Sequence, residues 1–405
     1  MQTNILLYTD NLLTYTAANG GLVENYCITL LQLLRGSDFH FFNAYNRNSY
    51  QTDNEHKNNF YFNPTECFHV RKDSTVEELA LFISKYRIKI IHIHQCGADS
   101  LNLFRKAANR SNCIIITTCH SKPYSLLLNY TFSYCLRKMR QVSLKGKILL
   151  LKRLLMLNSN RKSAADKIQS MYHAIFSSSD RVIISSECFV PEMERILQRE
   201  ISGNEYQVIS PCVPYKRYFP EEFVKRIKLN EIAVIGIFDE TRLNLKRIID
   251  IWTRIQATPK YIGWVLRIIG KGVSYSEYKK KILTSKNIIF ENFSQLESCY
   301  NTASIYISAA ELVDTIDPFL LGAMQNGLVP VVYNTSEQYS EIIDNECNGF
   351  ILPVNSDEEN FEEKLCCLMD DEELRNKMAK HAIAGSKKYS QQKFKDSYAK
   401  LYSQI

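Results

Sequence analysis

Short apolar runs alternate with amphipathic segments along almost the whole chain, and this alternation restricts the fold more than any other feature. In the first half, the apolar runs with the length of buried strands lie at 4–10, 38–45, 88–94, 112–120 and 178–186. The helical patterns between them lie at 23–34, 75–87 and 188–200. Apolar strands separated by helices are typical of parallel βαβ units, whose sheets are covered on both faces. The alternation predicts an α/β fold with doubly wound sheets.

A proline-rich segment at 207–222 divides the chain, because Pro211, Pro214 and Pro220 make it a stiff linker. A single core rarely keeps growing to 405 residues, so two domains are expected. We predict domains at 1–208 and 209–388 and a closing helix at 389–405. Their sheets face a cleft, with ligands at the carboxyl ends of the strands.

A second alternation follows the linker. Its strands are expected at 231–238, 261–270, 287–292, 304–310 and 329–334. Its helices are expected up to about Ala257, through Tyr278, near Glu297 and over 317–327, where Asn326-Gly327 is a stop signal. Each half therefore contains enough alternating elements for its own sheet.

Cysteine usage and the N-terminus indicate a cytoplasmic protein. The twelve cysteines include no C-x-x-C pair, and several lie in apolar runs where a free thiol packs as a small hydrophobe. A reducing compartment is expected. The N-terminal residues lead directly into a strand pattern without the features of a signal peptide. The longest apolar run, 148–157, contains Lys152 and Arg153 and is too short to span a bilayer.

Positive charge is concentrated between Arg137 and Lys167. This segment holds ten Lys or Arg residues and one acid, and the whole chain has a net charge of +7. Four apolar residues fall at helical spacing, namely Leu144, Ile148, Leu151 and Leu155. The pattern indicates peripheral contact with an anionic membrane, at the inner face if the protein is cytoplasmic. The alternative, slightly favoured by base rates, is a core-facing helix with a solvated basic face.

Motifs that bind phosphate or metal are absent from the sequence. It contains neither G-x-x-x-x-G-K-[ST] nor G-x-G-x-x-G, and it contains no Asp-x-Asp pair that would bind a metal diphosphate. We therefore expect neither metal nor cofactor. Phosphate would instead be held by helix N-termini and basic side chains. Gly20-Gly21, between the first strand and the first helix, supplies such an N-terminus.

Three histidines lie near strand ends. His120 ends the run at 112–120 and so reaches the expected cleft, where it can contact a sugar hydroxyl or hold charge. A single strand-end histidine is more often structural. His92 and His94 share one face at strand spacing, which suggests either a metal pair or, more commonly, buried packing.

The order of these motifs resembles that of the retaining GT-B glycosyltransferases of the large family 4 type, also called group 1. The similar stretches run over nearly the whole chain: the first strand with Gly20-Gly21, TTCH ending at His120, SDRVIISSE at 179–187, the linker VISPCVPYKRYFP at 208–220, Glu341 with NGFILPV at 348–354, and the final helix at 389–405, which in that family crosses back onto the N-terminal domain. The resemblance implies two Rossmann-like domains, the first for the acceptor and the second for the donor nucleotide.

The family's most diagnostic site is a pair of glutamates with seven residues between them, followed by Ala-Met. When Ala323-Met324 is aligned with this Ala-Met, Asp314 falls at the first acid, which in the family lies under the donor sugar. Gly322 falls at the second acid, which in the family holds the nucleotide ribose. The resemblance also assigns Asp317, Pro318, Phe319 and Glu341 to donor binding.

The family holds the donor diphosphate with an arginine and a lysine just before a helix. Here Leu243 falls at the lysine position, with Arg242 beside it and Lys246 one turn on, and either cation can substitute. The resemblance thus implies a degenerate donor site.

Two functions follow from the resemblance. The first is a retaining, metal-independent transfer of sugar from a UDP- or GDP-linked donor to a lipid-linked or glycan acceptor, with His120 and Asp314 as catalytic residues, in polysaccharide or lipopolysaccharide assembly. The alternative is a non-catalytic partner or acceptor-binding subunit of an active transferase. Nucleic acid is not expected as a partner, because no recognised binding module accompanies the basic segment.

Overall fold

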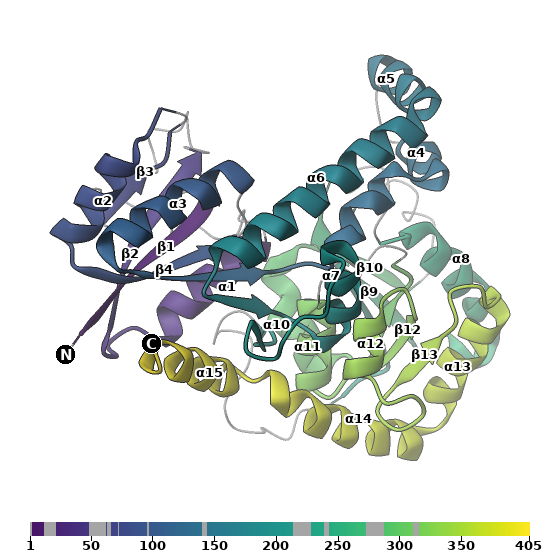
Figure 1. Ribbon diagram of the computed structural model, residues 1–405. Coiled ribbons are helices and arrows are strands. Elements are labelled where there is room, and N and C mark those ends of the chain that lie inside the picture. Colours follow the sequence, from purple (N-terminus) through teal and green to yellow (C-terminus); the bar gives the residue numbers. More distant parts are fainter. Residues whose placement is uncertain are drawn as a thin grey trace, which may run out of the picture. The chain divides into compact units, whose positions relative to one another are not determined.

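The computed structural model describes residues 2–11, 22–47, 62, 66–71, 73–94, 97–139, 144–213, 228–238, 243–272, 287–310 and 316–405. The chain forms two compact units (Figure 1). Unit 1 comprises Met1–Tyr124, Lys162–Pro214 and Gln391–Ile405. Unit 2 comprises Ser125–Arg161 and Tyr215–Ser390.

Unit 1 is built on a seven-stranded sheet with the order β3-β2-β1-β4-β5-β6-β7. Its strands are β1 (Thr3–Asn11), β2 (Phe39–Arg47), β3 (Cys67–His69), β4 (Ile88–His94), β5 (Ile114–Cys119), β6 (Arg181–Ile184) and β7 (Tyr206–Val208). All neighbouring strands pair in parallel. The predicted doubly wound α/β fold is confirmed for this unit.

Helices cover both faces of this sheet (Figure 1). They are α1 (Leu22–Leu33), α2 (Val76–Lys85), α3 (Ala98–Ser111), α6 (Leu157–Ser178, which begins in unit 2), α7 (Val190–Leu197) and α15 (Gln391–Ser403). On one face, Ile5 and Leu7 of β1 join a core cluster with residues of α1 and α15. On the other face, Tyr8 packs edge-on against Phe104 of α3, with ring centroids 4.9 Å apart.

The elements α3, β3 and β7 of unit 1 were not predicted from the sequence. The segment between β4 and β5 was expected to be a polar turn, but it contains the 14-residue helix α3. This helix buries only a narrow stripe of residues, namely Leu101, Phe104, Ala107 and Ala108. Because most of its other residues are polar, the apolar residues are too few to show a clear helical period in the sequence. The predicted linker also begins too early, because Tyr206–Val208 forms the edge strand β7 against β6.

Unit 2 contains a six-stranded sheet with the order β10-β9-β8-β11-β12-β13. Its strands are β8 (Glu231–Ile237), β9 (Val265–Lys271), β10 (Ile288–Glu291), β11 (Ile305–Ser308), β12 (Val329–Tyr333) and β13 (Phe350–Leu352). All neighbouring pairs are again parallel. The five strands expected after the linker all form.

Most helices of unit 2 alternate with its strands, but the first two come earlier in the chain, between β5 and β6. The helices of unit 2 are α4 (Phe132–Met139), α5 (Leu144–Leu155), α8 (Leu245–Gln256), α10 (Leu296–Thr302), α11 (Pro318–Gln325), α12 (Glu337–Ile342), α13 (Glu358–Asp370) and α14 (Glu372–Ser386). Helices α8 and α13 bury Trp252 and Phe361 against one face of the sheet. The predicted stop after α11 is confirmed by Gly327, which has a φ of 74°. The helix expected through Tyr278 lies outside the described residues.

The carboxyl ends of β8 and β9 approach each other so closely that glycine is required there. A Cβ at Gly270 would lie 2.0 Å from the carbonyl oxygen of Gly236 and 2.8 Å from the ring of Phe238. Because neither a backbone atom nor a buried ring moves at low cost, Gly270 is a packing requirement of the central strands.

We expect Gly270→Ala to lower the free energy of unfolding by at least about 2 kcal/mol, since the strands must separate to admit the methyl group. Urea titration followed by circular dichroism measures the change. Gly263→Ala is the matched control, because a Cβ at Gly263 meets nothing within 4 Å. Equal stability of the two variants would contradict the steric argument.

Candidate functional site

The parallel pairing of β4 with β5 brings three histidines together at the carboxyl ends of these strands. His94 lies opposite Thr118 in this pairing. Residues of one strand alternate between faces, so His92, His94 and His120 all project to the face covered by α1 and α15. This three-residue set is called the histidine cluster below.

Hydrogen bonds link the cluster internally and to α15. Nδ1 of His94 lies 2.9 Å from Nε2 of His120. Nδ1 of His92 lies 2.6 Å from the hydroxyl of Tyr402, and its Nε2 lies 2.7 Å from Oγ1 of Thr118. His92 is therefore fixed at both ring nitrogens, and His120 is held through His94.

Aromatic rings enclose the cluster. Tyr26 of α1 stands edge-on to His120, with centroids 4.7 Å apart, and its hydroxyl lies 2.6 Å from that of Tyr398 on α15. His94 lies between His92 and His120, with ring centroids 4.1 Å and 5.1 Å apart. His92 and His94 are fully buried, whereas His120 keeps part of its side chain exposed.

Burial keeps these imidazoles neutral. It lowers the pKa of His92 and of His120 to about 3, and it lowers the pKa of His94 well below the usual value. The neighbouring histidines add to the effect on His92 and His94, because a second positive charge nearby would be repelled. Neutral His120 can therefore donate from one ring nitrogen and accept at the other, but it carries no charge at pH 7.

The packing interpretation of His92 and His94 is confirmed by their complete burial. Throughout the described part of the chain, no group of three or more His, Cys, Asp or Glu residues is placed to hold a metal ion.

In unit 2, the predicted donor residues gather at the N-terminus of α11. Asp317 caps this helix: its Oδ1 accepts from the Phe319 amide at 2.9 Å, and its Oδ2 accepts from the Tyr306 hydroxyl at 2.9 Å. Burial raises the pKa of Asp317 above its usual value. Pro318 occupies the first helical position, where its missing N–H costs nothing. Gly322 is buried in the middle of the helix, where its carbonyl accepts from Nδ2 of Asn326 at 2.8 Å.

The remaining described candidates of unit 2 differ in exposure. Leu243 is only 7% exposed and belongs to the core cluster. It packs on Gly236, where a Cβ would lie 3.2 Å from the leucine methyl. Lys246, in the first turn of α8, is exposed. Glu341 of α12 is half-buried, and its carbonyl oxygen accepts from Lys388 at 2.7 Å.

Four candidates, Gly20, Gly21, Arg242 and Asp314, lie outside the described residues. The structure therefore describes His120 in unit 1 and Lys246, Asp317, Pro318, Phe319, Gly322 and Glu341 in unit 2. It brings Asp317, Pro318, Phe319 and Gly322 onto one short helix.

The basic segment exposes apolar side chains. In α5, Ile148, Leu151 and Leu155 are 51%, 53% and 89% exposed, whereas Leu150 is 9% exposed. The core-facing alternative is therefore wrong for these three residues: the helix buries the side that carries Leu150. Leu149 and Met156 extend the exposed surface at 70% and 57%. Among the described residues, no helix is long and apolar enough to cross a bilayer.

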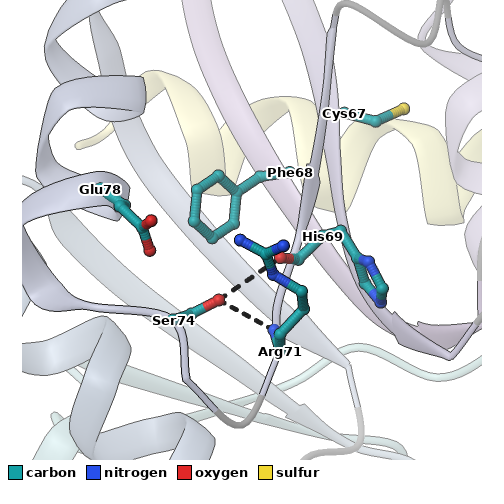
Figure 2. Close-up of a pocket in the computed structure, with 6 residues that line it drawn as sticks. All are labelled: Cys67, Phe68, His69, Arg71, Ser74 and Glu78. Atoms are coloured by element: carbon teal, nitrogen blue, oxygen red, sulfur yellow. Dashed lines mark hydrogen bonds between the residues drawn. The ribbon is translucent and has the colours of Figure 1, made fainter.

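A hollow of about 390 Å³ lies beside β3 in unit 1 (Figure 2). It is lined by Cys67, Phe68, His69, Arg71, Ser74 and Glu78. Its polar groups hold the local backbone: Ser74 accepts from the Arg71 amide at 2.9 Å, and Glu78 accepts from the Thr75 amide at 2.9 Å as part of a capping box. Ser74 and Glu78 therefore stabilise a turn and a helix cap, and this local role explains why these polar side chains line the hollow.

The sequence did not indicate the partners of His120. His94 was interpreted either as one of a metal pair or, more commonly, as a packing residue, and Tyr26, Tyr398 and Tyr402 were not singled out. The spacing of Tyr398 and Tyr402, four residues apart on the closing helix, is the signal that places both hydroxyls on one face.

We predict that acidification destabilises the protein partly through His92. Its pKa is about 3 when folded and about 6.5 when unfolded, so the unfolded chain binds the extra proton and stability falls as pH drops below about 6.5. Between pH 6.5 and 5 the loss from His92 is about 2 kcal/mol. Urea midpoints of His92→Gln should therefore change less with pH than those of wild type. His173→Gln, at an exposed site on α6, should retain the wild-type slope; an unchanged slope in His92→Gln would contradict the prediction.

Comparison with known families gives one match. Residues 219–384 match the family model described as glycosyl transferases group 1, and this segment lies within unit 2. No curated protein sequence matches the chain.

Solved structures share the whole fold at low sequence identity. The sucrose-phosphate synthase from Thermosynechococcus elongatus is 13% identical with a TM-score of 0.65, covering 100% of this chain and 99% of that chain. The lipopolysaccharide outer core galactosyltransferase WaaB is 13% identical with a TM-score of 0.63, covering 100% of both chains. The Anabaena protein HepE, in complex with UDP, is 10% identical with a TM-score of 0.67, covering 100% of both chains. The resemblance to glycosyltransferases is thereby confirmed: the chain has the GT-B fold with two Rossmann-like sheets, and its segment 219–384 carries the pattern of the group 1 glycosyl transferases.

Proposed function

We propose that this protein is a glycosyltransferase that moves a sugar from a nucleotide-sugar donor to an acceptor hydroxyl with retention of configuration and without a metal ion. The observation that carries the proposal is His120. It is a neutral, partly exposed imidazole at the carboxyl end of a parallel strand, held by a hydrogen bond to His94. In open parallel sheets this edge is where ligands bind.

The proposed roles follow the chemistry of each group. Domain 1–208 takes the acceptor, domain 209–388 takes the donor nucleotide, and the helix at 389–405 closes the first domain. His120 contacts the donor sugar, and Asp314 binds its hydroxyls. The Gly20-Gly21 loop, Arg242 and Lys246 stabilise the leaving diphosphate, since fixed donors and cations act most strongly where charge develops.

The N-terminus of α11 forms the wall of the proposed donor site. Both oxygens of Asp317 are used inside the protein, so its proposed role is to hold the helix end rather than to touch the donor. Pro318 and Phe319 begin this helix, and Glu341 lies on the following helix, α12. With Gly322 at the family's ribose position, the donor loses charge-assisted hydrogen bonds, which weakens its binding by roughly ten- to hundred-fold.

UDP is the nucleotide we favour over GDP, because the similar HepE structures were solved with UDP and with UDP-glucose. The proposed acceptor is a glycan or a lipid-linked glycan, in polysaccharide or lipopolysaccharide assembly. The similar galactosyltransferase WaaB acts on the lipopolysaccharide outer core.

A second function, a non-catalytic partner of an active transferase, is favoured by one observation. Leu243, at the position of the family's diphosphate lysine, is buried in the core of unit 2. Because this side chain packs in the core, Arg242 and Lys246 are the cations proposed to hold the diphosphate together with the Gly20-Gly21 loop.

Calorimetric titration with UDP, GDP and ADP separates the two functions. An enzyme should bind one nucleotide saturably and hydrolyse or transfer its sugar, and the double variant His120→Ala, Asp314→Ala should lose at least about 100-fold in turnover. His173→Ala, at an exposed site, is the matched control. Absence of nucleotide binding at millimolar concentration would overturn the transferase proposal and leave the partner function.

We also propose that the segment 137–167 docks on an anionic membrane at the cytoplasmic face. The exposed apolar side of α5 offers Ile148, Leu151 and Leu155 to the lipid. Ten Lys or Arg residues in the segment supply the complementary charge. Buried apolar area and attraction to anionic headgroups together favour an interfacial helix over a solvated one.

The double variant Leu151→Asp, Leu155→Asp should bind phosphatidylglycerol vesicles at least about tenfold more weakly than wild type, because it removes apolar burial and adds negative charge. Vesicle sedimentation at low salt measures the change. Leu81→Asp, on α2 of unit 1 and 71% exposed, controls for charge alone and should bind as wild type does. Equal binding by all three proteins, or equal binding to phosphatidylcholine, would contradict membrane docking.

A further inference from the structure

One buried ring nitrogen determines where the protons of the histidine cluster lie. Nε2 of His94 is buried and has no hydrogen-bond partner among the described residues. The other ring nitrogen of His94, Nδ1, bonds to Nε2 of His120 at 2.9 Å. His94 is neutral, so only one of its two nitrogens carries a proton.

Two proton arrangements fit this geometry. In the first, His94 donates from Nδ1, and its unpaired Nε2 is a bare lone pair. In the second, His120 donates from Nε2, and the unpaired atom of His94 is a buried N–H. Buried N–H groups without partners are rarer in proteins than under-used acceptors. The first arrangement is therefore favoured.

The first arrangement also decides the state of His120. Its Nε2 accepts from His94, so the ring proton lies on Nδ1. Throughout the described part of the chain, no group bonds to this second nitrogen, and His120 is the only member of the cluster with exposed surface. His120 thus offers a hydrogen-bond donor outward.

We propose that His94 is a positioning residue that holds His120 as the tautomer with its proton on Nδ1, so that His120 donates a hydrogen bond to an oxygen of the bound sugar. This inference rests on the proposed function for the identity of the ligand. The proton assignment itself rests only on the cluster.

The surroundings of the cluster hold its rings in the orientation on which the assignment rests. A ring flip of His120 would exchange Nε2 for a carbon and so break its bond to His94. His94 is kept in place by the ring of His92, 4.1 Å away, and His92 is bonded at both nitrogens to Tyr402 and Thr118. The last helix of the chain therefore supports the orientation of His120 through two intervening rings.

Nitrogen NMR of protein labelled with ¹⁵N-histidine tests the assignment, because protonated and unprotonated ring nitrogens resonate far apart. The His120 signals are those missing in His120→Gln. We expect a protonated Nδ1 and an unprotonated Nε2 at pH 7.5. A proton on Nε2 of His120 would overturn the proposal, whether or not sugar transfer is observed.

Three substitutions of His94 then test its effect. His94→Asn keeps a donor near the position of Nδ1 and should preserve the tautomer. His94→Asp offers only an acceptor and should move the proton of His120 to Nε2. His94→Phe offers neither and should leave His120 as a mixture. Preservation of the wild-type signals in His94→Asp would contradict control by His94.

Turnover of the nucleotide sugar provides a separate readout. His94→Phe and His94→Asp should lower kcat by about 10- to 100-fold, the usual effect of losing an orienting partner, while UDP affinity stays within about twofold. His94→Asn should recover most of the loss, and His173→Asn, at an exposed histidine, should match wild type. Equal loss in His94→Asn and His94→Phe would indicate a purely structural residue and overturn the positioning role.

If wild-type protein shows the predicted tautomer but no nucleotide binding, the transferase proposal fails and the proton assignment stands. If it binds and turns over the donor with the proton on Nε2, the assignment fails and the transferase proposal stands. Circular dichroism of each variant at the assay temperature verifies that it is folded.

Discussion

The parallel pairing of β4 with β5 is the constraint on which the site in unit 1 depends. Because His94 lies opposite Thr118, the two strands end with their histidines on the same face and within hydrogen-bond reach. An antiparallel pairing would place the two strand ends at opposite edges of the sheet. Parallel pairing requires a crossover, and α3 provides it. A helix that the sequence pattern hides is thus what makes the histidine cluster possible.

The cluster also depends on the end of the chain. Tyr398 and Tyr402 of α15 are buried among residues of β1 and α1, and their hydroxyls bond to Tyr26 and His92. A tyrosine hydroxyl inside a core needs a partner, and a buried histidine needs one too, so each satisfies the other. The last helix therefore completes both the core and the polar network of unit 1.

The two units differ in the residues at their candidate site positions. In unit 1, burial produces neutral histidines whose role is set by hydrogen bonds. In unit 2, Leu243 joins the core and Gly322 lies inside α11, at the two positions that the proposed alignment gives to charged residues of the family. Asp317 stabilises that same helix by capping it. Under the proposed alignment, Gly322 and Leu243 remove two of the groups that would hold a nucleotide. Nucleotide binding is therefore the property that separates the two proposed functions.

The sequence by itself determined the α/β class, the strands of both sheets that carry long apolar runs, and the resemblance to GT-B glycosyltransferases. These features are local, since apolar period and turn residues act over a few positions. Only the tertiary structure decided that His94 bonds to His120, that Tyr402 supports His92, and that the apolar side of α5 is exposed. Each of these depends on contacts between residues far apart in the chain, or on which face a helix buries, and no local pattern encodes either.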